Sequence, residues 1–268
     1  MESITYLQHT PFFTFTTGVL DSQHFARRKE DSPLRILEVG CGSGEFSVLL
    51  KRHYKQKVEL IAIDPSEDDI KAAQTKTTDV TYIHTGLLNW QPDSPDTKFD
   101  VIICTKSLHH CDDLERVVKR AYDLLVKGGI LLAEELQPEN MNVESMQWLF
   151  DRFDLLQMAN LFNPADLRSP YSIVLDTSIP AEARWLAHLK LRDCHSSDTV
   201  KEAVTTIFGR ERTRIINKTP FIHYYLVKFG LKDSAIGKSV LSEFMAQEDR
   251  ALASDSITSL GFTIVAEK

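Results

Sequence analysis

The chain has 268 residues, of which 43% are hydrophobic and 26% charged, an ordinary composition for a globular protein with a sizeable core. Its 38 acidic side chains outnumber 31 basic ones, which gives a formal net charge of −7. This balance argues against a protein that neutralises nucleic-acid phosphates or anionic lipid, so no nucleic-acid partner is expected. The apolar runs are far shorter than the roughly 20 residues of a membrane span, so no span is expected either.

The start of the chain and its cysteines indicate a cytoplasmic protein. An acidic residue follows Met1 directly, and no basic segment precedes an apolar one, as a secretory signal would require. The four cysteines form no C-x-x-C pair. Without export, these thiols are expected to stay reduced.

From residue 34 to 135, short β-branched runs alternate with helical patterns, which is typical of βαβ units on a parallel sheet. Ser66 and Asp112 are the predicted N-caps of two of the helices, and Gly128 follows the second of these. The pattern predicts strands at 34–39, 60–64, 80–84, 99–105 and 130–135, with helices at 44–55, from 67, and at 112–127. We therefore predict a doubly wound α/β fold with a mostly parallel sheet.

The alternation stops after residue 135, and a helical insertion is expected before the last strands. An irregular connection is predicted at 163–180, where prolines gather. The remaining patterns predict helices at 140–162, 181–191, 199–208 and 234–254, and strands at 213–217, 221–227 and 262–267.

A glycine-rich turn ends the first strand and leads into a helix; it reads Glu38-Val39-Gly40-Cys41-Gly42-Ser43-Gly44. Such glycines let the backbone turn tightly and approach a ligand. Asp64 ends the second strand, where an acid can accept hydrogen bonds from both ribose hydroxyls. The dinucleotide pattern G-x-G-x-x-G fails, because its sixth position is Glu45. Glu38 suits a positively charged amino group better than a pyrophosphate.

This turn resembles the first motif of class I S-adenosylmethionine-dependent methyltransferases, in which an acid at the place of Asp64 binds the cofactor ribose. Two further segments resemble the family's fourth strand with its turn and its entry to the fifth strand: Phe99-Asp100-Val101-Ile102-Ile103 followed by Ser107-Leu108-His109-His110, and Leu124-Leu125-Val126-Lys127-Gly128-Gly129-Ile130-Leu131. The resemblance covers about residues 34–135 and, more loosely, the last strand. It implies a Rossmann-like fold, S-adenosyl-L-methionine as cofactor, and methyl transfer as activity.

The resemblance also implies a cofactor site at the carboxyl edge of the sheet. The expected contacts are Glu38, Gly40, Cys41, Gly42, Gly44, Asp64, Pro65, Leu87, Leu88 and Thr105. For Gly44, helix packing alone is the alternative, and for Pro65 it is helix initiation. The family often has an acid after the third strand that contacts the adenine amino group, but Leu87 stands there. Adenine recognition is then expected from backbone groups, from Asn89, or from packing.

His109, His110 and Glu135 are the candidate catalytic residues, because they follow or end strands at this same edge. A histidine near its ordinary pKa can take a proton from an acceptor. The alternative is that the histidines orient a loop; we favour it, with His110 the exception if one of them acts as a base. Glu135 could equally cap a helix or pair with a lysine. Consecutive ligands at 109–113 lack chelating geometry, so no metal is expected.

We therefore expect a methyltransferase that acts on a small molecule. An apolar stripe within 141–162 predicts an apolar or aromatic acceptor, and Phe12, Phe13 and Phe15 could add a lid. The expected parts are an N-terminal lid segment (1–33), a cofactor-binding core (34–135), a helical insertion that covers the substrate (136–211), and strands with a helix that complete the sheet (212–268). One alternative is a protein or RNA methyltransferase, supported by a basic stripe at 210–214; another is a catalytically silent cofactor-binding protein. The oligomeric state is left open.

Overall fold

The computed structural model describes residues 3–25, 32–92, 94–163 and 171–268. The chain divides into two compact units. The sheet unit comprises His9–Glu135, Cys194–Ile216 and Thr263–Lys268, and the helical unit comprises Met1–Gln8, Leu136–Asp193 and Asn217–Phe262. The predicted lid segment (1–33) and the predicted irregular connection (163–180) both include residues outside the described ranges.

Within the described ranges the sheet has seven strands, in the order β3-β2-β1-β4-β5-β7-β6. The strands are β1 (Leu34–Val39), β2 (Val58–Asp64), β3 (Thr81–His84), β4 (Phe99–Thr105), β5 (Leu125–Leu136), β6 (Thr213–Thr219) and β7 (Gly261–Glu267). The first five pair in parallel. The end of β7 lies antiparallel to the start of β5, because Gly128 N donates to Lys268 O and Lys268 N donates to Gly129 O.

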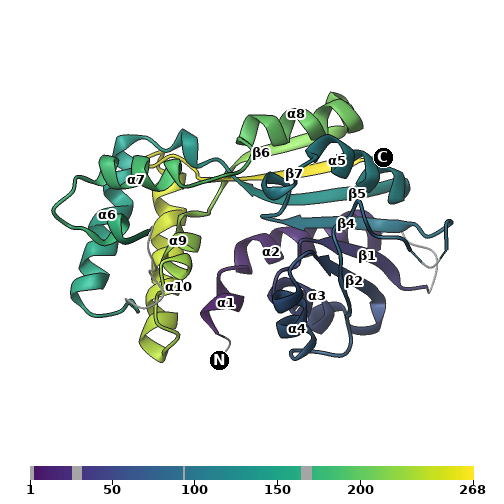
Figure 1. Cartoon of the computed structure of the whole chain (residues 1–268), viewed down its shortest axis with the longest axis horizontal. Helices are drawn as coiled ribbons and strands as arrows, with labels where there is room; N and C mark the ends of the chain where they lie inside the picture. Colours follow the sequence, from purple (N-terminus) through teal and green to yellow (C-terminus); the bar gives the residue numbers. More distant parts are fainter. Residues whose placement is uncertain (1–2, 26–31, 93, 164–170) are drawn as a thin grey trace. The chain divides into compact units, whose positions relative to one another are not determined.

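Helices cover both faces of this sheet, as Figure 1 shows. One face carries α2 (Thr10–Val19), α3 (Glu45–Tyr54) and α4 (Glu67–Gln74), and the other α5 (Leu114–Leu124) and α8 (Ser197–Phe208). The predicted doubly wound, mostly parallel α/β fold is therefore confirmed. The sheet reverses its winding at β1, which pairs with β2 on one side and β4 on the other. Parallel sheets bind ligands at the carboxyl ends of strands beside such a point.

The N-terminal aromatic side chains join the core of the sheet unit. Phe12 on α2 is fully buried, and its ring stacks on that of Phe46 with 5.3 Å between centroids. Phe13 and Phe15 pack partly buried against the same core. Phe12, expected in a lid, is therefore a core residue.

The helix α5 differs from its prediction at both ends. It ends at Leu124 rather than near Lys127, because pairing with the last strand draws the following residues into β5. Its N-cap is Asp113, whose carboxylate accepts the N–H of Arg116, rather than the predicted Asp112. Helical spacing alone does not predict the strand pairing that ends α5 or the hydrogen bond of Asp113 that caps it.

The described residues of the helical unit form α1 (Ile4–Leu7), α6 (Val143–Met158), α7 (Ala181–Lys190), α9 (Ile222–Lys228) and α10 (Ala235–Ala253), with short 3-10 turns. The strand predicted at 221–227 is wrong, because this segment forms α9. Glu248 of α10 accepts the N–H groups of Phe221, Ile222 and His223 and so caps the new helix. No helix in the described part of the chain is long and apolar enough to cross a membrane.

The grouping of segments differs from the predicted parts. The sheet unit includes α2 and α8, which were assigned to the lid segment (1–33) and the insertion (136–211). Tyr122 of α5 and Phe208 of α8 lie edge to face at 5.1 Å, which explains why α8 packs with the sheet. Most of 212–268, expected to complete the sheet, belongs to the helical unit.

Candidate active site

The glycine loop between β1 and α3 is fixed by backbone hydrogen bonds to β2. Gly40 N and Cys41 N donate to Ile63 O at 2.8 and 3.1 Å, and Gly44 N donates to Cys41 O at 3.0 Å. The backbone is left-handed at Gly40 (φ +73°), Gly42 (φ +51°) and Gly44 (φ +82°). This conformation strains residues that carry a Cβ, which explains why the sequence places glycine at all three positions.

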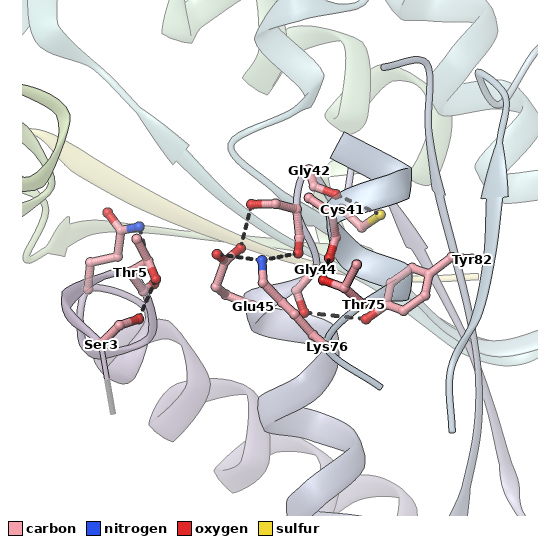
Figure 2. Close-up of polar contacts among 12 residues, drawn as sticks. Ser3, Thr5, Cys41, Gly42, Gly44, Glu45, Thr75, Lys76 and Tyr82 are labelled. Atoms are coloured by element: carbon pink, nitrogen blue, oxygen red, sulfur yellow. Dashed lines mark hydrogen bonds and ion pairs between the residues drawn. The ribbon is translucent and has the colours of Figure 1, made fainter. Parts of the chain in front are cut away.

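The three glycines differ in what surrounds them. A Cβ on Gly40 would lie 2.3 Å from that of Ser107, and a Cβ on Gly44 would lie 2.7 Å from the Tyr82 hydroxyl. Both positions are therefore packed against protein. A Cβ on Gly42 would meet no atom within 4 Å, so this residue leaves its side of the loop open. Figure 2 shows Tyr82 pointing toward Gly44.

Asp64, at the end of β2, joins the loop to the next helix. Its Oδ2 accepts the N–H of Gly42 and its Oδ1 accepts the N–H of Ser66, both at 2.8 Å. Ser66 in turn caps α4 by accepting the N–H of Asp69, as predicted. Pro65 between them is exposed, and its carbonyl lies 2.9 Å from Nε2 of His84.

Glu38 lies in the interior rather than on the surface of the loop. Its side chain is fully buried, and its carboxylate accepts hydrogen bonds from Ser47 and, at 3.3 Å, from Thr105. Burial raises the pKa of Glu38 to about 7. Both carboxylate oxygens of Glu38 are therefore already hydrogen-bonded within the protein, and the side chain packs inside the sheet unit rather than facing a ligand.

The end of β4 turns sharply at Lys106, whose φ of +58° is rare for a residue with a side chain. Lys106 N donates to Glu134 O at 2.8 Å, and its ammonium lies 3.6 Å from Oε2 of Glu134 and 3.3 Å from Nδ1 of His9. The next residue, Ser107, donates from its hydroxyl to Val39 O at 2.7 Å. The turn thereby ties β4 to the base of the glycine loop.

The structure brings the three catalytic candidates together and joins two of them by a hydrogen bond. Nδ1 of His109 donates to Oε2 of Glu135 at 2.6 Å, and Leu108 N donates to Oε1 of the same carboxylate at 2.7 Å. Glu135 is fully buried and His109 is 5% exposed. His110 is exposed, with its ring centroid 4.0 Å from that of His109. Glu135 therefore orients the turn and the His109 ring.

The remaining predicted contacts are mainly apolar. Cys41 is buried, and this raises the pKa of its thiol well above the ordinary range, so the thiol stays protonated. Leu87 is buried, Leu88 is half-buried and Asn89 is exposed. Among the described residues, no group of three or more His, Cys, Asp or Glu side chains is arranged to hold a metal ion.

Sequence reasoning missed the side chains that hold the loop in place: Ser47, Lys76 and Ser107. Ser47 carried one signal, because a polar residue stands beside Phe46 on the buried side of its helix. Lys76 and Ser107 carried none, because their partners Ser43 and Val39 are distant in sequence.

The apolar stripe of α6 and its flanks is mostly core of the helical unit. Five of its members are buried: Met141, Met146, Phe150, Phe153 and Phe162. Met158 is 82% exposed, and Trp148 packs half-buried against Phe244 with 5.1 Å between ring centroids. Most residues of the stripe therefore serve as core of the helical unit rather than as the wall of a substrate pocket.

The family described as "Methyltransferase domain" matches residues 17–169 of this chain. A malonyl-[acyl-carrier protein] O-methyltransferase 1 of Ilyobacter polytropus is 34% identical over 95 residues, which cover 35% of each chain. A trans-aconitate 2-methyltransferase of Afipia carboxidovorans is 28% identical over 111 residues, or 41% of each chain. The matches thus span less than half the length of these relatives.

Among solved structures, the plantazolicin methyltransferase BpumL, crystallised with a pentazolic desmethylPZN analog and SAH, is similar in fold. It superimposes with a TM-score of 0.56 at 16% identity, covering 98% of this chain and 85% of that one. A sarcosine dimethylglycine methyltransferase described from Galdieria sulphuraria gives a TM-score of 0.51 at 13% identity, covering 95% of this chain and 84% of that one. At such identities the likeness concerns the fold alone.

Proposed function

The chain belongs to the methyltransferase domain family, and from this premise we propose that it transfers a methyl group from S-adenosyl-L-methionine to a small-molecule acceptor. The observation that carries the proposal is the open side of Gly42, which lies directly beside the carboxylate of Asp64. A ligand can approach the backbone at Gly42, and the carboxylate of Asp64 can accept hydrogen bonds from the ligand's hydroxyl groups.

The residues at the carboxyl edge fit a nucleoside with a charged amino-acid tail. Each oxygen of Asp64 accepts one backbone N–H, and an ionised carboxylate offers about four acceptor sites, so ribose hydroxyls can still bind. The space beside Gly42 admits a ligand that a Cβ would exclude. Leu87 and Leu88 offer apolar surface in place of an acid for the adenine.

Glu38 has a different part in this proposal from the one predicted for it. Because its carboxylate is buried and hydrogen-bonded by Ser47 and Thr105, it would shape the site rather than touch the cofactor. Gly40 and Gly44 act in the same indirect way, since both are packed against protein. Gly42, Asp64, Cys41, Pro65 and the leucines at 87 and 88 remain the proposed contacts.

When bound, S-adenosyl-L-methionine supplies an electrophilic methyl group on a sulfonium sulfur, which an acceptor lone pair can attack in line. The protein then has to hold the acceptor at attack distance and keep water out. For an acceptor that carries a proton, His110 is the proposed base, because it is exposed to solvent whereas His109 is only 5% exposed. His109 and Glu135 would act by holding the turn that carries His110.

The acceptor is proposed only as a small organic molecule. The apolar or aromatic character predicted from the α6 stripe has little support, because most of those side chains are core. The names of the relatives add malonyl-[acyl-carrier protein] and trans-aconitate as compounds to test. The cytoplasmic location inferred from the sequence stays a prediction.

Isothermal titration of the full chain with S-adenosylhomocysteine and S-adenosylmethionine tests the cofactor, with AMP and NAD as comparison ligands. We expect saturable binding of both sulfur nucleosides, at least 10-fold tighter than that of AMP or NAD. Dissociation constants weaker than about 1 mM for both would overturn the proposal. Release of S-adenosylhomocysteine with trans-aconitate, phenolic and amine acceptors, or with a metabolite extract, then separates an enzyme from a silent binding protein.

A further inference from the structure

Lys76 lies just after α4, yet its side chain reaches back to the glycine loop. Its ammonium donates to the backbone carbonyl of Ser43 and, at 2.8 Å, to Oε1 of Glu45. The hydroxyl of Ser43 donates to the other oxygen of Glu45 at 2.9 Å. The three residues therefore form a closed cluster, in which Figure 2 shows Lys76 pointing toward Glu45.

This cluster holds the part of the loop that β2 does not hold. Gly40, Cys41 and Gly42 are tied by their N–H groups to Ile63 and Asp64. Ser43 follows the open Gly42, and the carbonyl of Ser43 accepts the hydrogen bond from Lys76. The loop is thus fixed on both sides of the residue whose surroundings are open.

The cluster is shielded enough for its charges to matter. The side chains of Lys76 and Glu45 are 22% and 12% exposed, so water screens their attraction less than it would on the open surface. Glu45 stands in the first turn of α3, where a negative charge is favourable. Lys76 balances this charge, so the rim of the loop presents an ion pair rather than a bare carboxylate.

We propose that Lys76 is a positioning residue for cofactor binding, which acts by gripping Ser43 and Glu45 so that Gly42 keeps its open, left-handed conformation. This inference rests on the proposed function for its ligand, but its effect on the loop exists without one. Lys71 supplies a matched control on α4. It pairs with Glu67 at 2.8 Å, and both of these side chains are more than 60% exposed.

The experiment compares Lys76→Met and Lys71→Met, each of which replaces an ammonium by an uncharged chain of similar length. The first readout is hydrogen–deuterium exchange of the segment 41–46 in the ligand-free protein. The second is the dissociation constant for S-adenosylhomocysteine from titration calorimetry. We expect Lys76→Met to exchange faster in this segment and to bind about 10-fold more weakly, as for loss of a charged hydrogen bond. Lys71→Met should match the wild type in both readouts.

Two further variants separate positioning from general stability. Lys76→Arg keeps the charge and should recover most of the affinity, whereas a space-filling role predicts that Lys76→Met already binds normally. Glu45→Gln should weaken binding less than Lys76→Met, and the double variant should lose less than the sum of both, because the two residues act through one contact. These variants also test the inference if Lys76→Met fails to fold.

Unchanged exchange and affinity in Lys76→Met would overturn the inference, and so would equal losses in Lys71→Met. Absence of S-adenosylhomocysteine binding by the wild type would instead overturn the proposed function. In that case the exchange measurement still decides whether Lys76 orders the loop.

Discussion

Gly42 donates its backbone N–H to Oδ2 of Asp64 at 2.8 Å, so the tip of the loop after β1 is tied directly to the acid that ends β2. The other oxygen of Asp64 holds the N–H of Ser66 at the start of α4. One carboxylate therefore sets the position of both the loop and the next helix. The two residues predicted separately as ligand contacts form one structural unit.

Replacing Gly42 by alanine should reduce cofactor affinity while preserving the fold. The new Cβ meets no protein atom, but it occupies the space that a ligand would need. Gly128 is the matched control, because its φ is +77° and its Cβ would also meet nothing within 4 Å. Both variants should lose about 1 kcal/mol of stability from the positive φ. Calorimetry should show at least 10-fold weaker S-adenosylhomocysteine binding only for Gly42→Ala. If both alanine variants bind with the same affinity, Gly42 is not a cofactor contact.

Asp64→Asn should lower both stability and affinity. In the wild type, both oxygens of Asp64 accept a backbone N–H. Asparagine has only one side-chain oxygen, so its amide group faces the other donor and one partly buried hydrogen bond is lost. We expect about 1–3 kcal/mol less free energy of unfolding in urea, together with weaker S-adenosylhomocysteine binding. Asp68→Asn, an exposed position in the first turn of α4, is the control; it should leave the affinity unchanged and cost less than about 1 kcal/mol, the usual value of an exposed charge at a helix start. A variant that unfolds earlier but binds normally would leave Asp64 a purely structural role.

The features predicted well from the sequence are those that depend on local spacing. The strands β1, β2 and β4 were recognised from their apolar runs, and the cap at Ser66 from its distance to Asp69. The location of Asp64 beside the glycine loop follows from parallel pairing of β1 with β2. Such relationships need only a strand period and a right-handed connection.

The features that were not predicted depend on partners distant in sequence. The segment 221–227 has the composition of a strand, but Glu248 satisfies the backbone of Phe221, Ile222 and His223 and makes it a helix. Glu38 was expected to face a ligand because its neighbours are glycines. Its burial depends on Ser47 and Thr105, which come from α3 and β4.

Glu38→Gln should change how stability depends on pH. The pKa of Glu38 is raised from 4.5 to about 7 mainly by burial, against hydrogen bonds from Ser47 and Thr105 and the nearby charge of Lys106. The folded state therefore holds this proton more tightly than the unfolded state. The resulting stabilisation is full below pH 4.5 and is lost as the pH rises to about 7. The loss amounts to roughly 3 kcal/mol for a shift of this size.

Urea unfolding of wild type and Glu38→Gln at several values between about pH 5 and pH 8 measures this effect. Because glutamine carries no charge, the variant should gain stability relative to wild type as the pH rises. A difference in unfolding free energy that stays constant over this range would show that Glu38 keeps an ordinary pKa.

His109→Ala should mainly lower stability, whereas His110→Ala should mainly lower the methyl-transfer rate. Removal of His109 leaves the fully buried Glu135 without its 2.6 Å partner, so we expect a loss of about 3 kcal/mol or more in unfolding free energy. His110 is exposed, and its loss should change stability by less than about 0.5 kcal/mol. If His110 takes the acceptor proton, His110→Ala should lower the methyl-transfer rate by about 10²–10⁴-fold with unchanged S-adenosylhomocysteine affinity.

The pH dependence of the rate decides whether histidine acts as a base at all. The loss in His110→Ala should shrink as the pH rises, because more of the acceptor is then deprotonated without help. The wild-type rate should rise from about pH 6 to about pH 8, across the range in which histidine titrates. A flat wild-type profile over this range would exclude a histidine base. His109 would then serve to hold the turn after β4 through the carboxylate of Glu135.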